Sequence, residues 1–146
     1  MRFDRAVLGL VGVLFIPFGL WGVVNPVAVT AMTQVSLPTA TALADGRAVY
    51  GGLTLGLAVY FVVCALRPEL VLAGLWALLL TIGGAFLGRL TGVAFDGARN
   101  PDTLRTLGLE LAIATLAAIA LRTGASVATR NLTDFQAMGC PCANPL

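Results

Sequence analysis

The chain has 146 residues, of which 58% are hydrophobic and only 11% are charged, and its mean hydropathy is +0.92. A water-soluble domain of this length cannot bury so much apolar surface, so the composition indicates an integral membrane protein. The net charge of +2 is too small to indicate nucleic-acid binding. The sequence contains no histidine, a common ligand of haem, zinc and di-iron centres. We therefore expect no cofactor, no metal site and no enzyme activity.

Four apolar runs are each close to the roughly 20 residues that cross about 30 Å of hydrocarbon. Backbone polar groups in lipid must be paired within their own segment, so these runs predict helices. Residues 1–124 are expected to form one all-α transmembrane domain, an antiparallel four-helix bundle, and residues 125–146 an extramembrane tail. The expected helices cover residues 6–24, 48–66, 69–92 and 103–122.

The first expected helix, residues 6–24, follows a short segment that contains Arg2 and Arg5. Basic residues ahead of an apolar run are also typical of a signal peptide. This run is longer than a usual signal-peptide core, so we interpret it as a retained helix. The segment between Pro26 and Pro38 is weakly apolar and can hold a short helix along the membrane interface.

The second and third expected helices, residues 48–66 and 69–92, are separated only by Arg67 and Pro68. Pro68 cannot continue a helix, so we expect a tight hairpin at this point. Asp45 is predicted to be the N-cap of the second helix.

A polar turn leads to the fourth expected helix, residues 103–122, and Asp102 or Thr103 is predicted to be its N-cap. Short connections make successive helices antiparallel, so both termini are expected on one side of the membrane. That side has slightly more arginine residues than the other. Arg2 and Arg5, which precede the first helix, have the most influence on the orientation in the membrane. The positive-inside rule then places both termini in the cytoplasm.

The three cysteines fall in two settings. Cys64 lies within an apolar run and is expected to be buried as a small apolar side chain. Cys140 and Cys142 lie in the tail, where the main interpretation is a pair of free thiols. The alternatives are a metal or thiol-exchange site that involves a partner, and S-acylation next to the membrane.

Charged side chains within the apolar runs are the main candidates for a functional site. At about 1.5 Å per residue, Arg47 and Arg89 lie about 30 Å from the opposite ends of their helices, at the outer boundary of the membrane. Glu110 lies deeper, where an unpaired carboxylate costs on the order of 2–3 kcal/mol. We predict an outer polar cluster in which Arg47 or Arg89 reaches Glu110, with Tyr50 and Asp96 nearby. A structural ion pair, a ligand or proton site and a subunit interface all remain possible roles.

Small residues at helical spacing indicate close packing in the second and third helices. The interpretation is an accessory or scaffolding membrane protein that packs with itself or with a larger membrane complex. The alternative is binding or transport of a small amphipathic ligand, a lipid or a quinone, in the outer polar cluster. The predicted packing positions are Gly51, Gly52 and Gly56 in the second helix, and Gly84, Gly88 and Gly92 in the third.

The segments DGRAVYGGLTLGLAVY and GGAFLGRLTGVAFDG resemble the DUF4345 family of small bacterial four-helix membrane proteins, which is distantly similar to the DoxX-like group. The resemblance covers about Gly19 to Arg122. It implies a four-helix fold in a bacterial inner membrane, and it implies no particular chemistry. Where the family usually has a glutamate before the arginine of the second helix, this chain has Asp45 and Gly46. The matching residues are Arg47, Tyr50, Gly51, Gly52, Gly88, Arg89, Asp96, Gly97 and Glu110.

Overall fold

The structure is a computed structural model that describes residues 3–124. Within that range every regular element is a helix, and there is no strand. In chain order the elements are α1 (Phe3–Val24), α2 (Pro26–Ala31), α3 (Ala40–Gly46), the π-helix η1 (Arg47–Leu53), α4 (Thr54–Leu66), the 3₁₀ turn η2 (Pro68–Leu70), α5 (Val71–Phe95) and α6 (Pro101–Gly124).

Four helices of the described chain are long and apolar enough to cross a membrane. Because α3, η1 and α4 are continuous, they form a single span. The predicted all-α fold with four membrane-spanning helices is thus confirmed, and each span is longer than its apolar run. The spans are Phe3–Val24, Ala40–Leu66, Pro68–Phe95 and Pro101–Thr123.

Both predicted helix caps are wrong. Thr39 caps the second span, where its hydroxyl accepts a hydrogen bond from a backbone N–H of the first turn, and Asp45 lies inside the helix. Asn100 precedes the fourth span, and its Oδ1 accepts the N–H of Thr103 at 2.7 Å. Pro101 then occupies the first helical position, which has no need of an N–H. In both cases the helix begins ahead of the apolar run used to predict it.

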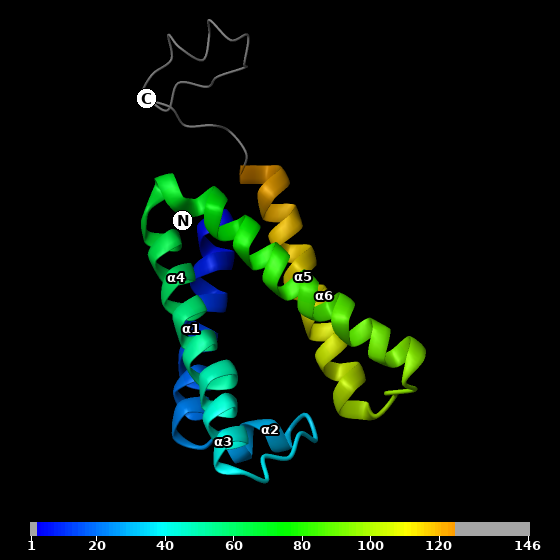
Figure 1. Cartoon of the computed structure of the whole chain (residues 1–146). Coiled ribbons are helices and arrows are strands. Elements are labelled where there is room, and N and C mark those ends of the chain that lie inside the picture. The colour runs from blue at the N-terminus through cyan, green and yellow to red at the C-terminus, as the bar shows by residue number, and fades with distance from the viewer. Residues whose placement is uncertain (1–2, 125–146) are drawn as a thin grey trace, which may run out of the picture.

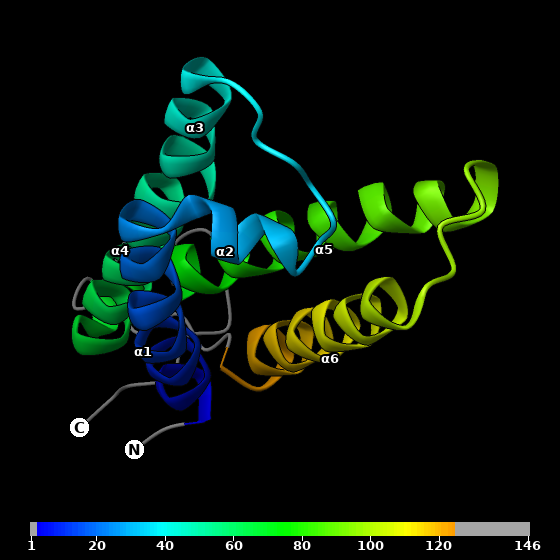
Figure 2. The same ribbon diagram turned by 90° about the horizontal axis from the view of Figure 1, so that it is seen from below.

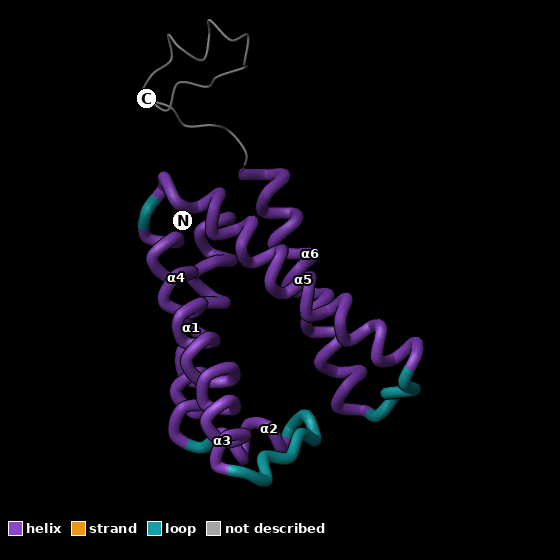
Figure 3. The backbone as a smooth tube through the Cα atoms, in the orientation of Figure 1, coloured by secondary structure: helices purple, strands orange, loops and turns teal. Residues whose placement is uncertain are grey.

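The helices form two antiparallel pairs (Figure 1). α1 lies along α4, and α5 lies along α6. The pairs meet at the end of the molecule that holds the start of α1 and the end of α6, and they diverge toward the other end (Figures 1 and 2). The longer loops, between α2 and α3 and between α5 and α6, lie at the divergent end (Figure 3).

The hydrophobic core lies where the two pairs meet, and all four spans contribute to it. Leu8 of α1, Phe61 of α4, Leu78 of α5 and Ala117 of α6 are completely buried. The divergent end has no comparable cluster among the described residues, so the apolar packing between the pairs is concentrated at one end of the molecule.

At Gly74 the two helix pairs approach each other closely. A Cβ atom at this position would lie 2.6 Å from the Cβ of Cys64 and 3.0 Å from the Cδ1 of Leu8. Cys64 is completely buried, as predicted. Glycine therefore allows α5 to pack directly onto the side chains of Leu8 in α1 and Cys64 in α4.

Glycines also bring α1 against the second span. A Cβ atom on Gly12 or Gly19 would lie less than 3.0 Å from backbone atoms of α4. Gly22 lies against the carbonyl group of Tyr50, and Gly51 faces the backbone of α1. Gly51 belongs to a predicted packing pattern, whereas the glycines of α1 do not. Their spacing of seven and then three residues follows the helical period and is the signal that identifies them.

Candidate functional site

The turn between α5 and α6 sets the register of the polar residues on that pair. Gly97 has a φ of +69°, a left-handed conformation that favours glycine. The backbone N–H groups of Asp96 and Ala98 both donate to the carbonyl of Gly92, at 3.0 and 3.2 Å. This compact turn makes α5 and α6 antiparallel neighbours, so that Arg89, in the last two turns of α5, and Glu110, in the third turn of α6, lie on adjacent helices close to the same end of the hairpin.

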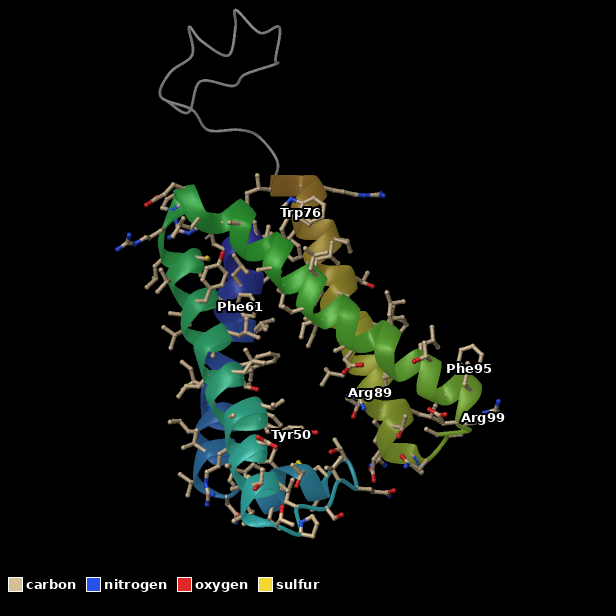
Figure 4. All side chains as sticks on the ribbon, viewed as in Figure 1. Tyr50, Phe61, Trp76, Arg89, Phe95 and Arg99 are labelled. Carbon is tan, nitrogen blue, oxygen red and sulfur yellow. The ribbon has the colours of Figure 1, made fainter. Side chains whose placement is uncertain are left out.

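Arg89 and Glu110 form an ion pair across this hairpin, and Figure 4 shows Arg89 between α5 and α6. Its Nε donates to Oε2 of Glu110 at 3.1 Å, and its Nη2 donates to Oε1 at 3.0 Å. Two parallel bonds of this kind are the strongest arginine–carboxylate arrangement. The Glu110 side chain is 11% exposed and that of Arg89 is 29% exposed. The carboxylate is therefore deep and paired, while part of the guanidinium remains accessible.

Arg47 does not join this pair. Its Nε donates to the carbonyl of Val23, at the end of α1, with a distance of 3.2 Å. At the other end of the same helix pair, Arg5 donates to the carbonyls of Ala65 and Leu66, at 2.6 and 3.2 Å. The last carbonyls of a helix have no partner within the helix and attract a positive charge. Arg5 and Arg47 thus each bind the C-terminal end of the neighbouring helix, and we call them the arginine caps.

Tyr50 and Asp96 also lie apart from the ion pair. Tyr50 is half-buried on η1, and Figure 4 shows it on the opposite side of the divergent end from Arg89. Asp96 is exposed at the end of α5, and within residues 3–124 no ion pair links it to Arg89. The structure therefore brings together Arg89 and Glu110 from the predicted polar cluster and leaves the other members elsewhere.

The segment that contains Arg47 and Tyr50 adopts a conformation that the sequence does not reveal. Residues 47–53 form the π-helix η1, and the hydroxyl of Thr54 donates to the carbonyl of Val49, five residues earlier, at 3.3 Å. A π-helix accommodates an extra residue within a helix and often occurs at functional sites. Here it places the backbone of Gly51 directly against α1.

A small polar pocket lies beside Arg89. The connection between α2 and α3 forms one wall, and the start of α6 forms another. Gln34, which has a positive φ of 58°, accepts a hydrogen bond from the amide of Asn100 at 3.4 Å across the pocket rim. None of the wall residues other than Arg89 was predicted as part of a site, because they come from the α2–α3 connection, the turn after α5 and the first turns of α6, where the sequence has no distinctive pattern. The lining residues are Met32, Thr33, Gln34, Arg89, Asn100, Asp102, Thr103 and Thr106.

The glycines predicted for packing in the third helix face open space. A Cβ atom on Gly84 or Gly88 would meet nothing within 4 Å. Gly56 of α4 is equally open, the nearest atom to Gly52 is a carbonyl oxygen of its own helix segment at 3.9 Å, and Gly92 faces only the turn that follows α5. Except for Gly51, these positions do not touch another span of the chain.

No group of three or more potential metal ligands occurs in the part of the chain that the structure describes. The predicted thiol positions, Cys140 and Cys142, lie outside it.

The model of a domain of unknown function, DUF4345, matches residues 3–121. The match covers nearly all of the four-span domain, including η1 and the Arg89–Glu110 pair. No curated protein and no solved structure matches the chain. The chain belongs to the DUF4345 family.

Proposed function

We propose that this integral membrane protein is an accessory or scaffolding protein of the bacterial inner membrane that packs against a second copy of itself through α5. The observation that carries the proposal is the open surface at Gly84 and Gly88, where an added Cβ would meet nothing within 4 Å. Elsewhere in this chain, at Gly19, Gly22 and Gly74, a glycine faces a closely approaching helix. The glycines of α5 would allow a helix of another protein molecule to approach equally closely.

The neighbouring residues suit contact between helices in lipid. Thr81 and Thr91 share the exposed face of Gly84 and Gly88 on α5. Their hydroxyls donate to carbonyls of the same helix at 2.7 Å, so that neither leaves an unpaired donor in an apolar interface. Leu87, which is 60% exposed, flanks this face and can pack beside a partner helix. Small residues with flanking leucines allow the van der Waals packing that drives association of transmembrane helices.

A second copy is favoured because the same surface can serve both partners. A two-fold interface joins identical patches, and a small-residue face is complementary to itself. The pair formed by α5 and α6 is also the less covered half of the molecule. In the most apolar 18-residue stretch of each span, 33% is buried within the protein in the first span, 22% in the third and 11% in the fourth.

The mass of the protein particle in lipid nanodiscs, measured by native mass spectrometry, tests this proposal. Wild type is expected to be dimeric. Gly88→Leu is expected to be monomeric, because its side chain would hold the two backbones apart while meeting nothing in its own chain. Gly56→Leu is the matched control, an exposed glycine with equal space on α4, and is expected to remain dimeric. A monomeric wild type, or a dimeric Gly88→Leu variant, would contradict the proposal.

A second candidate function is binding or transport of a small amphipathic ligand, a lipid or a quinone. The pocket beside Arg89 supports it, since a partly accessible guanidinium faces polar groups from a separate part of the chain. Pockets at which a few polar groups converge are the usual place for small ligands.

A further inference from the structure

We propose that the pocket beside Arg89 binds one uncharged carbonyl oxygen at the polar end of a membrane-soluble molecule, and that this ligand links the connection between α2 and α3 to the start of α6. The inference rests on the second candidate function above and gives the chemistry of its ligand. The ester carbonyl of a glycerolipid and the ring carbonyl of a quinone share that chemistry.

The size of the pocket selects a single small group. The cavity volume is about 20 Å³. A cavity needs about 10–15 Å³ to hold one water molecule, so this one accommodates a single oxygen-sized group. A phosphate, with its four oxygens, does not fit. The remainder of a ligand must therefore lie outside the cavity, as expected for a molecule with one polar end and an apolar body.

The charges around the pocket favour an uncharged ligand. Glu110 neutralises Arg89 through two hydrogen bonds. Asp102, the acidic residue of the wall, lies 3.7 Å from the guanidinium of Arg105. With each charge balanced locally, the pocket has no excess positive charge to attract a phosphate or carboxylate, and an added anion would compete with Glu110 for Arg89.

The polar atoms that face the pocket favour an acceptor. Arginine has five N–H donors, and the ion pair occupies Nε and Nη2 of Arg89, which leaves the Nη1 donors free of any hydrogen bond recorded among residues 3–124. The side-chain oxygens of Asn100 and Gln34 already accept hydrogen bonds at 2.7 and 3.4 Å. The Asp102 carboxylate in the wall lies 3.7 Å from Arg105. The Nη1 donors of Arg89 are then the groups that a ligand would satisfy, and a carbonyl oxygen is an acceptor that matches them.

The position of the pocket gives the ligand a structural effect. The bond between Asn100 and Gln34 is the one side-chain hydrogen bond within the described range that joins the α2–α3 connection to the α5–α6 hairpin. At 3.4 Å it is long and weak. An oxygen that contacts Arg89 and the loop at once adds a second link at the divergent end. Binding is expected to hold the two helix pairs closer together.

The test uses full-length protein in detergent, titrated with short-chain probes and followed by native mass spectrometry. The probes are dioctanoylglycerol, decylubiquinone and dioctyl phosphate, an anion that has no carbonyl group. We expect one of the two uncharged probes to bind at one site per chain, and the anionic probe to bind at least tenfold more weakly, a difference of about 1.4 kcal/mol. The stronger uncharged probe distinguishes a glycerolipid from a quinone.

Two threonines of α6 provide matched variants. The hydroxyl of Thr106 lines the pocket and donates to the carbonyl of Asp102 at 2.9 Å. Thr115 makes the same bond, to the carbonyl of Leu111 at 2.7 Å, on an exposed part of the helix away from the pocket. Thr106→Leu fills the cavity and should weaken binding about tenfold or more, whereas Thr115→Leu should leave binding unchanged. Equal unfolding temperatures would show that both variants fold.

Three results would overturn the inference. They differ in whether they also reject the pocket as a ligand site or the second candidate function. Binding that is the same in Thr106→Leu as in wild type would place the ligand elsewhere. Tightest binding by dioctyl phosphate, lost in Thr106→Leu, would keep the pocket as a ligand site but reject the uncharged class. Binding of none of the three probes would reject both this inference and the second candidate function, without bearing on self-association through α5.

Discussion

The side chain of Glu110 has its charge balanced by one neighbour, the guanidinium of Arg89, across the α5–α6 hairpin. Removing one partner of a buried ion pair leaves the other charge unpaired and typically costs about 3–5 kcal/mol. Replacing both partners with apolar residues of similar size removes that penalty. The two kinds of change therefore distinguish a pair that only holds the hairpin together from one that is retained for binding.

Arg89→Ala is expected to lower the free energy of unfolding by about 3–5 kcal/mol, because it leaves the Glu110 carboxylate unpaired in the hairpin. Glu110→Gln should lower it less, since the amide oxygen still accepts a hydrogen bond from the guanidinium. The double variant Arg89→Met with Glu110→Leu should regain most of the loss. Unfolding of the three variants in detergent, followed by circular dichroism against temperature, measures these differences.

Arg99→Ala is the control for this series. Arg99 is exposed in the turn after α5, and its removal should leave stability within about 0.5 kcal/mol of wild type. Equal and additive losses for the changes at Arg89 and Glu110 would show that the two side chains do not interact. A double variant that regains stability but no longer binds the probes of the pocket would indicate that binding is why the charges are kept.

For the polar site, the sequence predicts how deep each charged side chain lies along its helix. The rise per residue places Arg89 near the boundary and Glu110 below it, and the antiparallel hairpin then makes them neighbours. The partner of Arg47 was not predictable in this way. A long side chain at that depth can reach either a carboxylate or the free carbonyls at the end of an adjacent helix. Only the contact of α1 with η1, made possible by Gly22 and Gly51, selects the carbonyl of Val23.

At the scale of the helices, glycine patterns predict close contact without predicting its location. Gly84 and Gly88 have the familiar four-residue spacing and face open space, whereas Gly12 and Gly19 are seven residues apart and meet α4. Spacing shows only that two glycines share a face of a helix. Whether that face meets the same chain, another protein or lipid depends on the neighbouring helices.

Gly19→Ala is expected to lower the free energy of unfolding by about 1–3 kcal/mol. The new Cβ would lie 2.8 Å from the backbone nitrogen of Leu55 and 3.0 Å from its Cα, and these atoms can move only if α4 moves. Gly56→Ala, on an open face of α4, should have no effect or raise stability by up to about 1 kcal/mol, because alanine favours the helix. Chemical unfolding of both variants in mixed micelles measures the two values. A Gly19→Ala variant as stable as Gly56→Ala would contradict the tight packing of α1.

At the scale of the whole molecule, span length and short connections are enough to predict four antiparallel helices. The divergence of the two helix pairs was not predictable. In a soluble bundle the polar side of each helix reveals its outer face, but lipid is as apolar as a protein core. Leu78 of α5 is completely buried and Leu80 is 68% exposed, although the same residue type occupies both positions. Only the three-dimensional contacts distinguish the core from the lipid-facing surface.

The distribution of arginines along the sequence predicts the orientation of the protein in the membrane. Arg5, Arg67 and Arg122 lie at the end where the two helix pairs meet. In the sequence, Arg2 precedes the first span and Arg130 follows the fourth, both outside the described residues. Arg47, Arg99 and Arg105 lie toward the opposite end and Arg89 lies near its boundary, so the first end has the excess only when Arg2 and Arg130 are counted from the sequence. On that count the positive-inside rule predicts a cytoplasmic location for the first end. The caps formed by Arg5 and Arg47 do not change this comparison, because one lies at each end of the α1–α4 pair.

Single-cysteine labelling tests both the crossing of the membrane and its direction. Cys140 and Cys142 are changed to serine, while Cys64 is retained because it is completely buried. An impermeant maleimide is applied to spheroplasts and to inverted membrane vesicles, and protein solubilised in detergent serves as the control that each new cysteine can react.

Cysteines placed at Phe3, Glu69 and Thr123 are expected to react only in inverted vesicles, and one at Arg99 only in spheroplasts. The first three positions lie at the end where the helix pairs meet, and Arg99 lies in the turn at the divergent end, one span away from Glu69 and from Thr123. If all four patterns are reversed, the fold stands and the positive-inside argument is wrong, because the arginine excess is small. If Phe3 and Thr123 react from opposite sides, the number of crossings is odd. One of the four apolar helices would then lie outside the membrane, and the fourth span would be the first to re-examine, because its mean hydropathy of 1.7 is the lowest of the four.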